Sequence, residues 1–477
     1  MRDCRFLAAA KRRLIGDRAF YTQMIAIVVP MIIQNTVTNV VSLLDNVMVG
    51  RVGTLEMSAV AIVNQLLFVF NVCIFGGLSG AGIFATQYAG ARDEKGVRHC
   101  FRIKWIIVLG MMAFALAIFL TMPKQLIGIY LAGDTHAADV EKTLGFGMSY
   151  LSAMLWGLLP FALAQVYAST LREMGETKLP MMASVIGILT NLVFNYLLIF
   201  GKFGFPKMGV TGAAIATVLS RYLEMAIIVV YTHGRKDHFS FIRGAYRSLH
   251  VPGRLLGAVG KKGMPLLVNE FFWSIGMAFL MQCYSVRGLD VVAATNIAST
   301  VSNLFKVVFM SMGSAVAIMV GQALGANEGE KAKDIAWKLI AAAVASNAVM
   351  AVLLGMLSPV IPLIYNTEQG VRDIAQQMLL VVSVMMPFYS FCHCCYFTLR
   401  SGGRTIITSI FDSGYTWFVA APVAYVLAYL TDMPIVPLYL CVQSMEIIKC
   451  LMGFIMVEKG IWIRNIVAPG GAEEKAC

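Results

Sequence analysis

The amino-acid sequence predicts an all-α integral membrane protein with twelve transmembrane helices in two six-helix bundles related by internal duplication. Three observations carry this prediction: an apolar composition, twelve long apolar segments, and a repeat that relates the two halves of the chain. Of the 477 residues, 58% are hydrophobic and only 13% are charged. A soluble domain carries about 25% charged residues, so the composition excludes an ordinary soluble protein.

Twelve segments are long and apolar enough to cross a membrane, since a spanning helix needs about 20 apolar residues. They lie near residues 19–48, 57–90, 104–122, 144–171, 180–201, 209–232, 262–286, 291–325, 335–358, 374–399, 405–430 and 434–457. Transmembrane β-strands would instead appear as alternating segments of about 10 residues. The first apolar segment is itself long enough to span, so we expect a retained helix rather than a cleaved signal peptide.

The basic residues are distributed unevenly around these segments. The net charge of +12 could suggest a nucleic-acid partner. With the N-terminus inside, however, the alternating loops place most of the 38 Lys and Arg residues on the cytoplasmic side, as the positive-inside rule describes. We therefore predict a multi-pass protein of the cell (plasma) membrane with both termini cytoplasmic, surrounded by membrane lipid and without a nucleic-acid partner.

The two halves of the chain repeat each other. A shift of 235 residues aligns "QYAGA" at 87–91 with "QALGA" at 322–326, and it also aligns Pro30 with Pro265. A shift of 228 residues aligns "TLREMGET" at 170–177 with "TLRSGGRT" at 398–405. Because two repeated helix bundles that meet at a central cavity are a common transporter plan, the repeat favours transport.

The longest polar stretch separates the two repeats and predicts the domain organisation. The expected parts are a cytoplasmic N-terminal segment (1–18), an N-lobe of six helices (19–232), a cytoplasmic linker (233–261), a C-lobe of six helices (262–457) and a cytoplasmic tail (458–477).

Ionisable residues inside the predicted spans need a physical account, because each costs at least about 2.5–3.5 kcal/mol on insertion scales. Arg221 and Glu224 are three residues apart on one helical face and can pair. Glu446 and Lys449 have the same spacing with the charges reversed. We interpret both as structural pairs that face protein.

Glu270 has no cation within one helical turn along its own span. Burial without a cation disfavours the charged carboxylate, which suits a group that binds and releases a proton or Na⁺. A distant cation such as Lys306 is the structural alternative. Asp412, in "SIFDSGYTW", is a secondary candidate of the same kind.

Asp45, in "SLLDNVMVG", allows two interpretations: it marks the water interface, or it is a working acid inside the membrane. Asn191 and Asn195 are four residues apart on one face of the fifth span. Their amides could complete an oxygen cage for a cation at Asp45, or they could simply join helices by hydrogen bonds. Further amides of the same kind are Gln34, Asn35 and Gln165.

The cysteines of "CHCC" at 392–395 invite a metal interpretation. On a helix these positions do not converge on one ion, and no second cluster is present to complete four ligands. We therefore predict that they pack as small apolar side chains, and we expect no metal site beyond a possible Na⁺ at Asp45.

Several stretches resemble signatures of the multidrug and toxic compound extrusion (MATE) family. "VPMIIQNTVTNVVSLLDNVMVGRVG" followed by "EMSAVAIVNQ" is similar to the family's first motif. "TLREMGETKLPM", "GVTGAAIAT" and "NEFFWSIGM" resemble later ones, and the similarity covers the whole chain. The resemblance implies two six-helix lobes in a V shape and export of organic cations or drugs against inward Na⁺ or H⁺.

The resemblance also implies roles for single residues. Asp45 matches the first-span acid that is implicated in cation coupling. Asn191 and Asn195 match a polar pair of the fifth span, where Asn195 replaces a second Asp of some members. Glu270 resembles a seventh-span acid. The tenth span lacks the Asp that some members carry, and Arg404 stands where an acid is expected.

These observations together predict a secondary active antiporter rather than an enzyme, with small organic cations as substrates, no cofactor apart from the coupling ion, and a monomeric state. No HExxH motif or nucleophile elbow is present. The coupling-cation site is expected at Asp45, Asn191, Asn195, Gln165 and Glu270, and the substrate cavity at Gln34, Asn35, Trp273 and Asp412. The alternative is a lipid-linked precursor flippase of related architecture, which would need several unpaired cations to hold pyrophosphate.

Overall fold

The computed structural model describes residues 14–131, 137–248, 250–365 and 367–468, and these residues form helices and no strands. The first half of the chain contains α2 (Arg18–Gly50), α3 (Thr54–Gly90), α4 (Glu94–Thr121), α5 (Pro123–Leu131), α6 (Ala137–Leu155), α7 (Leu158–Glu173), α8 (Lys178–Phe200) and α9 (Gly209–Gly234), followed by the short η1 (Ser240–Ile242).

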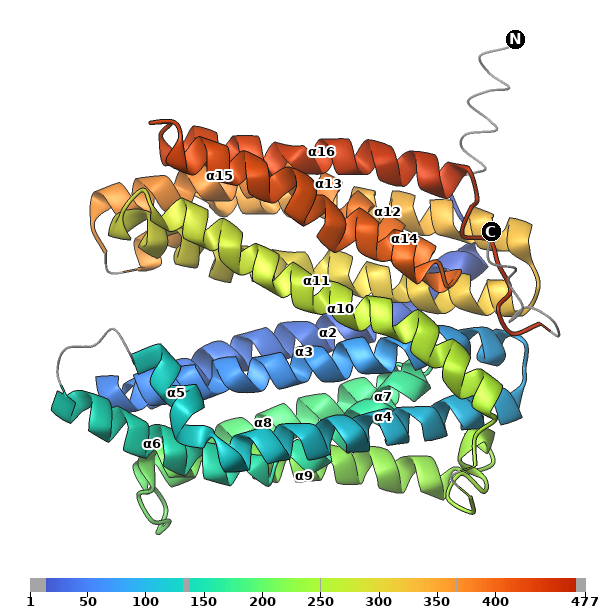
Figure 1. Cartoon of the computed structure of the whole chain (residues 1–477), viewed down its shortest axis with the longest axis horizontal. Helices are drawn as coiled ribbons and strands as arrows, with labels where there is room; N and C mark the ends of the chain where they lie inside the picture. Colours follow the sequence, from blue (N-terminus) through green and yellow to red (C-terminus); the bar gives the residue numbers. More distant parts are fainter. Residues whose placement is uncertain (1–13, 132–136, 249, 366, 469–477) are drawn as a thin grey trace. The chain divides into compact units, whose positions relative to one another are not determined.

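The second half repeats this succession of long helices (Figure 1). It contains α10 (Gly253–Ser285), α11 (Leu289–Gly325), α12 (Gly329–Leu357), η2 (Ile361–Ile364), α13 (Gln369–Ser401), α14 (Thr405–Ser409), η3 (Ile410–Gly414), η4 (Thr416–Ala420), α15 (Ala421–Tyr429) and α16 (Ile435–Glu458).

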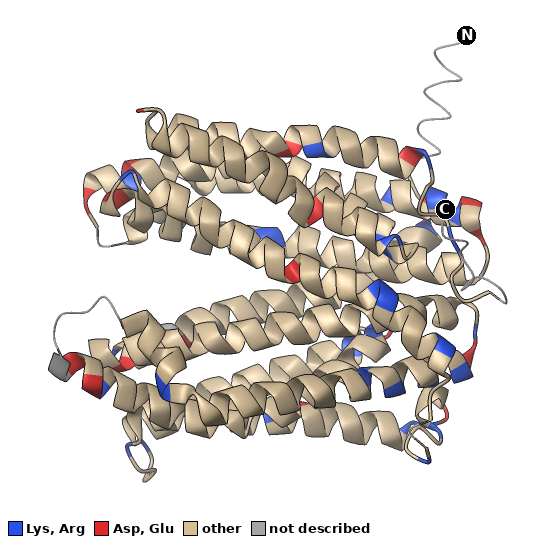
Figure 2. Cartoon of the chain, viewed as in Figure 1, with Lys and Arg blue, Asp and Glu red and all other residues tan. Residues whose placement is uncertain are grey.

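The described helices confirm the predicted all-α membrane fold. Ten of them are long and apolar enough to cross a membrane. Helices α6 and α7 form a pair that is bent by 48°, and counting this pair as one span gives eleven candidate spans. The eleventh expected segment, 405–430, is not one regular helix, because it runs through α14, the π-helical turns η3 and η4, and α15. Charged residues lie mainly at helix ends and in loops, with few along the spans (Figure 2).

The chain divides into two compact units. The N-terminal unit comprises Ile33–Ala85 and Glu94–Gly257, and the C-terminal unit comprises Met1–Ile32, Thr86–Asp93 and Ala258–Cys477. The start of α2 and the end of α3 thus belong to the same unit as the second half of the chain. Residues 233–257 belong to the N-terminal unit, where Arg98 and Arg102 of α4 donate hydrogen bonds to carbonyls of residues 240–250.

The core of the C-terminal unit is built on α11 and α13, which pack against each other and against α12 (Figure 1). In each of these two helices, 61% of the most apolar stretch of 18 residues is buried inside the protein. This is the largest buried share among the candidate spans of the described chain. Cys394 and Cys395 are fully buried in this apolar core. A Cβ atom at Gly313 would lie 2.5 Å from the ring of His393, so this glycine makes room for the imidazole.

The end of α3 joins the C-terminal unit through the repeated glycine motif. A Cβ atom at Gly90 would lie 1.9 Å from the carbonyl oxygen of Gln322, and one at Gly325 would lie 1.8 Å from that of Gln87. The Gln87 side chain is also held, because its amide nitrogen donates to Ser401 O at 2.9 Å and its oxygen accepts from Ile466 N at 2.8 Å. The "QYAGA" and "QALGA" repeats thus meet backbone to backbone.

Replacing Gly325 with alanine is expected to destabilise the protein, because its methyl group would overlap the carbonyl of Gln87. Overpacking of this kind costs about 1–3 kcal/mol, which should lower the thermal midpoint of the purified protein. Gly110→Ala is the matched control, since a Cβ atom at this position of α4 would meet nothing within 4 Å. An equal midpoint for the two variants would contradict the close crossing.

Candidate functional site

Asp45 lies in a cluster of amides within the N-terminal unit. The amide nitrogen of Asn195, on α8, donates to Asp45 Oδ1 at 2.8 Å. In the orientation that gives both ends of its amide a partner, Asn191 donates to Asp45 Oδ2 at 2.9 Å and accepts from the Thr217 hydroxyl at 3.1 Å. The spacing of four residues puts both asparagines on one face of α8, and both are buried. The structure therefore brings three of the predicted coupling residues together and adds Thr217 of α9.

The charge of Asp45 is left without a cationic partner, because no ion pair within the described residues includes this carboxylate. Asn195 Oδ1 is buried beside it and has no hydrogen-bond partner. An unpaired buried acceptor is costly, and oxygen atoms of carboxylates and amides are the ligands that hard cations prefer. The cluster thus offers oxygen atoms that a small cation or a proton would satisfy.

Among the described residues, two other predicted amides of the N-terminal unit, Gln165 and Gln34, are not hydrogen-bonded to Asp45. Gln165, on α7, makes no hydrogen bond to Asp45 or to either asparagine in the part of the chain described. Gln34 accepts a hydrogen bond from Arg172 Nη2 at 3.2 Å. Tyr150 of α6, which the sequence did not single out, interacts electrostatically with both Asp45 and Arg221.

Arg221 and Glu224, the predicted pair, form no direct ion pair within the described residues, and Glu224 lies in a wider electrostatic network. Glu224 interacts electrostatically with Arg172 of α7 as well as with Arg221. The Arg221 guanidinium lies 4.9 Å from the centroid of the Phe161 ring. Sequence spacing could identify only the partner on the same helix, and Arg172 comes from another one.

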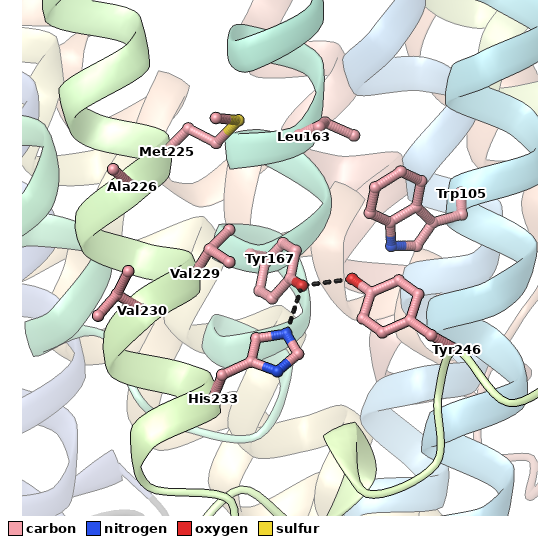
Figure 3. A pocket seen from close by; sticks show the side chains of 9 residues that line it. All are labelled: Trp105, Leu163, Tyr167, Met225, Ala226, Val229, Val230, His233 and Tyr246. Atoms are coloured by element: carbon pink, nitrogen blue, oxygen red, sulfur yellow. Dashed lines mark hydrogen bonds between the residues drawn. The ribbon is translucent and has the colours of Figure 1, made fainter.

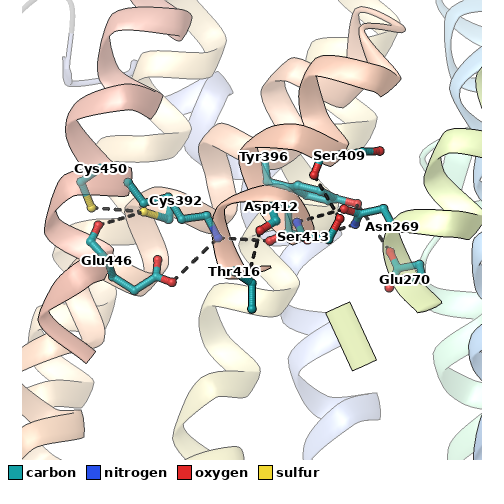
Figure 4. Close-up of polar contacts among 11 residues, drawn as sticks. Asn269, Glu270, Cys392, Tyr396, Ser409, Asp412, Ser413, Thr416, Glu446 and Cys450 are labelled. Carbon is teal, nitrogen blue, oxygen red and sulfur yellow. Dashed lines mark hydrogen bonds and ion pairs between the residues drawn. The ribbon is translucent and has the colours of Figure 1, made fainter. Parts of the chain in front are cut away.

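Asp412 is the centre of a polar cluster in the C-terminal unit (Figure 4). Its carboxylate accepts from Asn269 Nδ2 at 3.0 Å and from Lys449 Nζ at 3.1 Å. The predicted pair of Glu446 and Lys449 is present at 3.8 Å, so Asp412 is the nearer partner of Lys449. The pair is therefore not isolated, and the cluster of two carboxylates and one ammonium carries a net negative charge.

Two π-helical turns place Asp412 in this position. Asp412 is the central residue of η3, and η4 follows after Tyr415. Such turns occur frequently at functional sites. The backbone N–H of Ser413 donates to Asn269 Oδ1 at 3.2 Å, and Trp417 Nε1 donates to Phe272 O at 2.9 Å. Both contacts follow Asp412 in the chain, and they anchor the irregular segment to α10.

Glu270 lies beside this cluster, one residue after Asn269 in α10. The Tyr396 hydroxyl is 3.5 Å from Glu270 Oε1, and Glu270 interacts electrostatically with Arg400 and Asp412. The alternative partner Lys306 instead lies 6.0 Å from the centroid of the Tyr389 ring. Tyr396 and Arg400 are thus the groups that sequence spacing missed around Glu270. Trp273, the predicted cavity residue, is 37% exposed on α10.

A separate apolar pocket of about 330 Å³ lies within the N-terminal unit (Figure 3). The hydroxyl group of Tyr167 lies between His233 Nε2, at 3.0 Å, and the hydroxyl group of Tyr246. Trp105 and Val229 also line the pocket. None of the predicted site residues lies among its lining residues.

The matching helix succession in the two halves and the half-buried carboxylates along the spans define a membrane transporter of duplicated design. The MatE family model matches residues 30–197 and 265–430, one stretch in each half. The chain therefore belongs to the MatE family, which confirms the resemblance seen in the sequence.

Several relatives and solved structures extend this match over nearly the whole chain. The chain is 26% identical to the probable multidrug resistance protein YoeA of Bacillus subtilis, covering 87% of this chain and 88% of the relative. It is 22% identical to the probable multidrug resistance protein NorM of Thermotoga maritima, covering 93% and 94%. An outward-facing MATE transporter of the MOP superfamily is similar in fold, with a TM-score of 0.83, 20% identity, and coverage of 94% and 96%.

Proposed function

We propose that this protein is a secondary active antiporter that exports drugs and other small organic cations in exchange for Na⁺ or H⁺ by alternating access. The observation that carries the proposal is the Asp45 cluster, in which a carboxylate held by two amides lies beside the unpaired Asn195 Oδ1. The relatives named as multidrug resistance proteins support drug-like substrates.

The transport cycle follows from the chemistry of this cluster. Uptake of a coupling cation would neutralise Asp45 and satisfy Asn195 Oδ1, which stabilises one conformation over another. Only such a difference in affinity between conformations can drive transport. Glu270 is a second carboxylate that could take part in the C-terminal unit. Met and aromatic side chains adapt to varied apolar ligands, and the 30 Met residues of the chain fit such a cavity.

The topology that accompanies this proposal has both termini in the cytoplasm and lobes at 19–232 and 262–457. The charge distribution of the loops supports it through the positive-inside rule. In this proposal the protein acts as a monomer in the membrane, needs no cofactor other than the coupling ion, and binds no nucleic acid.

A lipid-linked precursor flippase has less support. Holding a pyrophosphate requires several cations that are free to bind it. In this protein Lys449 contacts two carboxylates, and Arg172 and Arg221 both interact with Glu224. Each of these three cations therefore already faces at least one acid of the chain.

Transport in proteoliposomes under separate gradients tests the proposal. The purified full chain is reconstituted, and movement of ethidium, a fluorescent organic cation, is followed under an inward Na⁺ gradient or an inward pH gradient. We expect one of the two gradients to drive ethidium against its own concentration gradient. Movement that neither gradient accelerates, compared with liposomes lacking protein, would contradict coupled antiport.

A further inference from the structure

The ammonium group of Lys449 occupies a cage of acidic and aromatic side chains. Its Nζ lies 3.1 Å from Asp412 Oδ1 and 3.8 Å from Glu446 Oε1. The same atom lies 5.4 Å from the centroid of the Phe411 ring and 6.0 Å from that of Tyr415. Lys449 is only 7% exposed. Carboxylates combined with aromatic faces are the surroundings in which proteins bind ammonium ligands.

This cage resembles the Asp45 cluster in one respect and differs from it in another. In both, an Asp accepts a hydrogen bond from an Asn on a different helix, at 2.8 Å for Asn195 to Asp45 and at 3.0 Å for Asn269 to Asp412. Asp412 has an ammonium as its second partner, whereas the partners of Asp45 are neutral amides. The difference between the two sites is therefore the tethered cation Lys449.

The internal repeat shows that the two halves have diverged at this point. The 228-residue shift pairs Lys449 with Arg221 and Asp412 with Ser184. Both halves thus keep a cation on the last long helix, but the N-terminal half has no acid at the position of Asp412. The acid that the N-terminal half holds by amides, Asp45, lies on α2 and forms no ion pair with the described part of the chain.

We infer that Lys449 is a built-in cation that fills the cation site of the C-terminal unit, so that Asp412 takes no external coupling ion. A tethered group competes at an effective concentration in the millimolar range or above, and here it is also held by two carboxylates. This inference rests on the proposed function and deepens it, because it assigns binding of the external cation to the Asp45 cluster.

The inference is tested by removing the tethered cation without changing the net charge of the cluster. Glu446→Gln combined with Lys449→Met deletes one negative and one positive charge and leaves Asp412 with Asn269. The purified full chain carries Asp45→Asn in addition, so that the N-terminal site is silent. We expect NaCl, compared with choline chloride at pH 8, to raise Tm by about 2 °C or more. If Asp412 takes up a proton instead, acidification to pH 6 should produce the gain.

Two control variants identify the group responsible. Adding Asp412→Asn to this background should abolish the gain, because the carboxylate is gone. Lys449→Arg with Asp45→Asn should show no gain, because a guanidinium still fills the cage. A folded Glu446→Gln/Lys449→Met protein that responds to neither Na⁺ nor acid overturns the inference, and so does a gain that persists without Asp412.

A measurement on the otherwise unmodified chain keeps the inference testable if the double variant does not fold. Asp45→Asn alone should remove the cation-dependent rise of Tm. A residual rise that Asp412→Asn then removes would show that Asp412 binds an external cation, which overturns the inference. Failure of the proposed function looks different, because Asp45→Asn would then leave both the full cation response and ethidium export unchanged.

Discussion

Replacing Asp45 with asparagine is expected to reduce gradient-driven export by about ten- to a hundredfold. Interactions with a charged group contribute about 1.5–3 kcal/mol, and each 1.4 kcal/mol corresponds to about tenfold in affinity. Asparagine keeps the size of the side chain but loses the negative charge, and the neighbouring Asn191 and Asn195 cannot replace it. Ethidium export from proteoliposomes, measured at a fixed gradient and a fixed amount of protein, gives the comparison.

An exchange of the two side chains separates the loss of charge from the loss of structure. Because Asn195 Nδ2 and Asp45 Oδ1 are 2.8 Å apart, Asp45→Asn with Asn195→Asp keeps one carboxylate and one amide in the same contact. We expect this double variant to recover part of the coupled export. Asp373→Asn is the charge-matched control on an exposed position of α13. Export by Asp45→Asn at the level of Asp373→Asn would exclude Asp45 from coupling.

The sequence was sufficient to predict the fold because apolar length and repetition are visible along the chain. Each expected span coincides with helical structure. The segment 405–430 contains two π-helical turns, which the pattern of apolar residues in the sequence did not predict. The Asp45 cluster was also predictable in part. Asn191 and Asn195 share a face by their spacing, and the family resemblance placed them with Asp45.

Partners on distant helices could not be predicted from spacing. Asp412 precedes Lys449 by 37 residues, and the i,i+3 rule pointed only to Glu446 on the same helix. Thr217 beside Asn191 was missed because a single threonine in an apolar helix has no distinguishing pattern. Gln165 was assigned to the coupling site by its residue type alone, and the structure does not place it in hydrogen-bond contact with Asp45.

Lys104 is a buried cation that the distribution of charges along the sequence did not identify. It lies at the first residue of the predicted span 104–122, and its side chain is 0% exposed. Lys104 Nζ lies 2.5 Å from Glu173 Oε2 and also donates to the hydroxyl groups of Ser169 and Thr170. A Cβ at Gly82 would lie 2.6 Å from Glu173 Oε1, so one glycine of the "GGLSGAG" stretch makes room for this ion pair.

Replacing Lys104 with methionine is therefore expected to destabilise the protein by about 3–5 kcal/mol, the usual cost of leaving one buried charge of a pair without its partner. The thermal midpoint of the purified protein should fall accordingly. Lys104→Met combined with Glu173→Gln removes both charges and should recover much of the loss, because replacing a whole buried pair is often nearly neutral. Lys331→Met is the surface control, since Lys331 pairs with Glu328 on an exposed face. If the double variant were as unstable as the sum of its single variants, the two charges would act independently, and the ion pair would not be what holds α4 to α7.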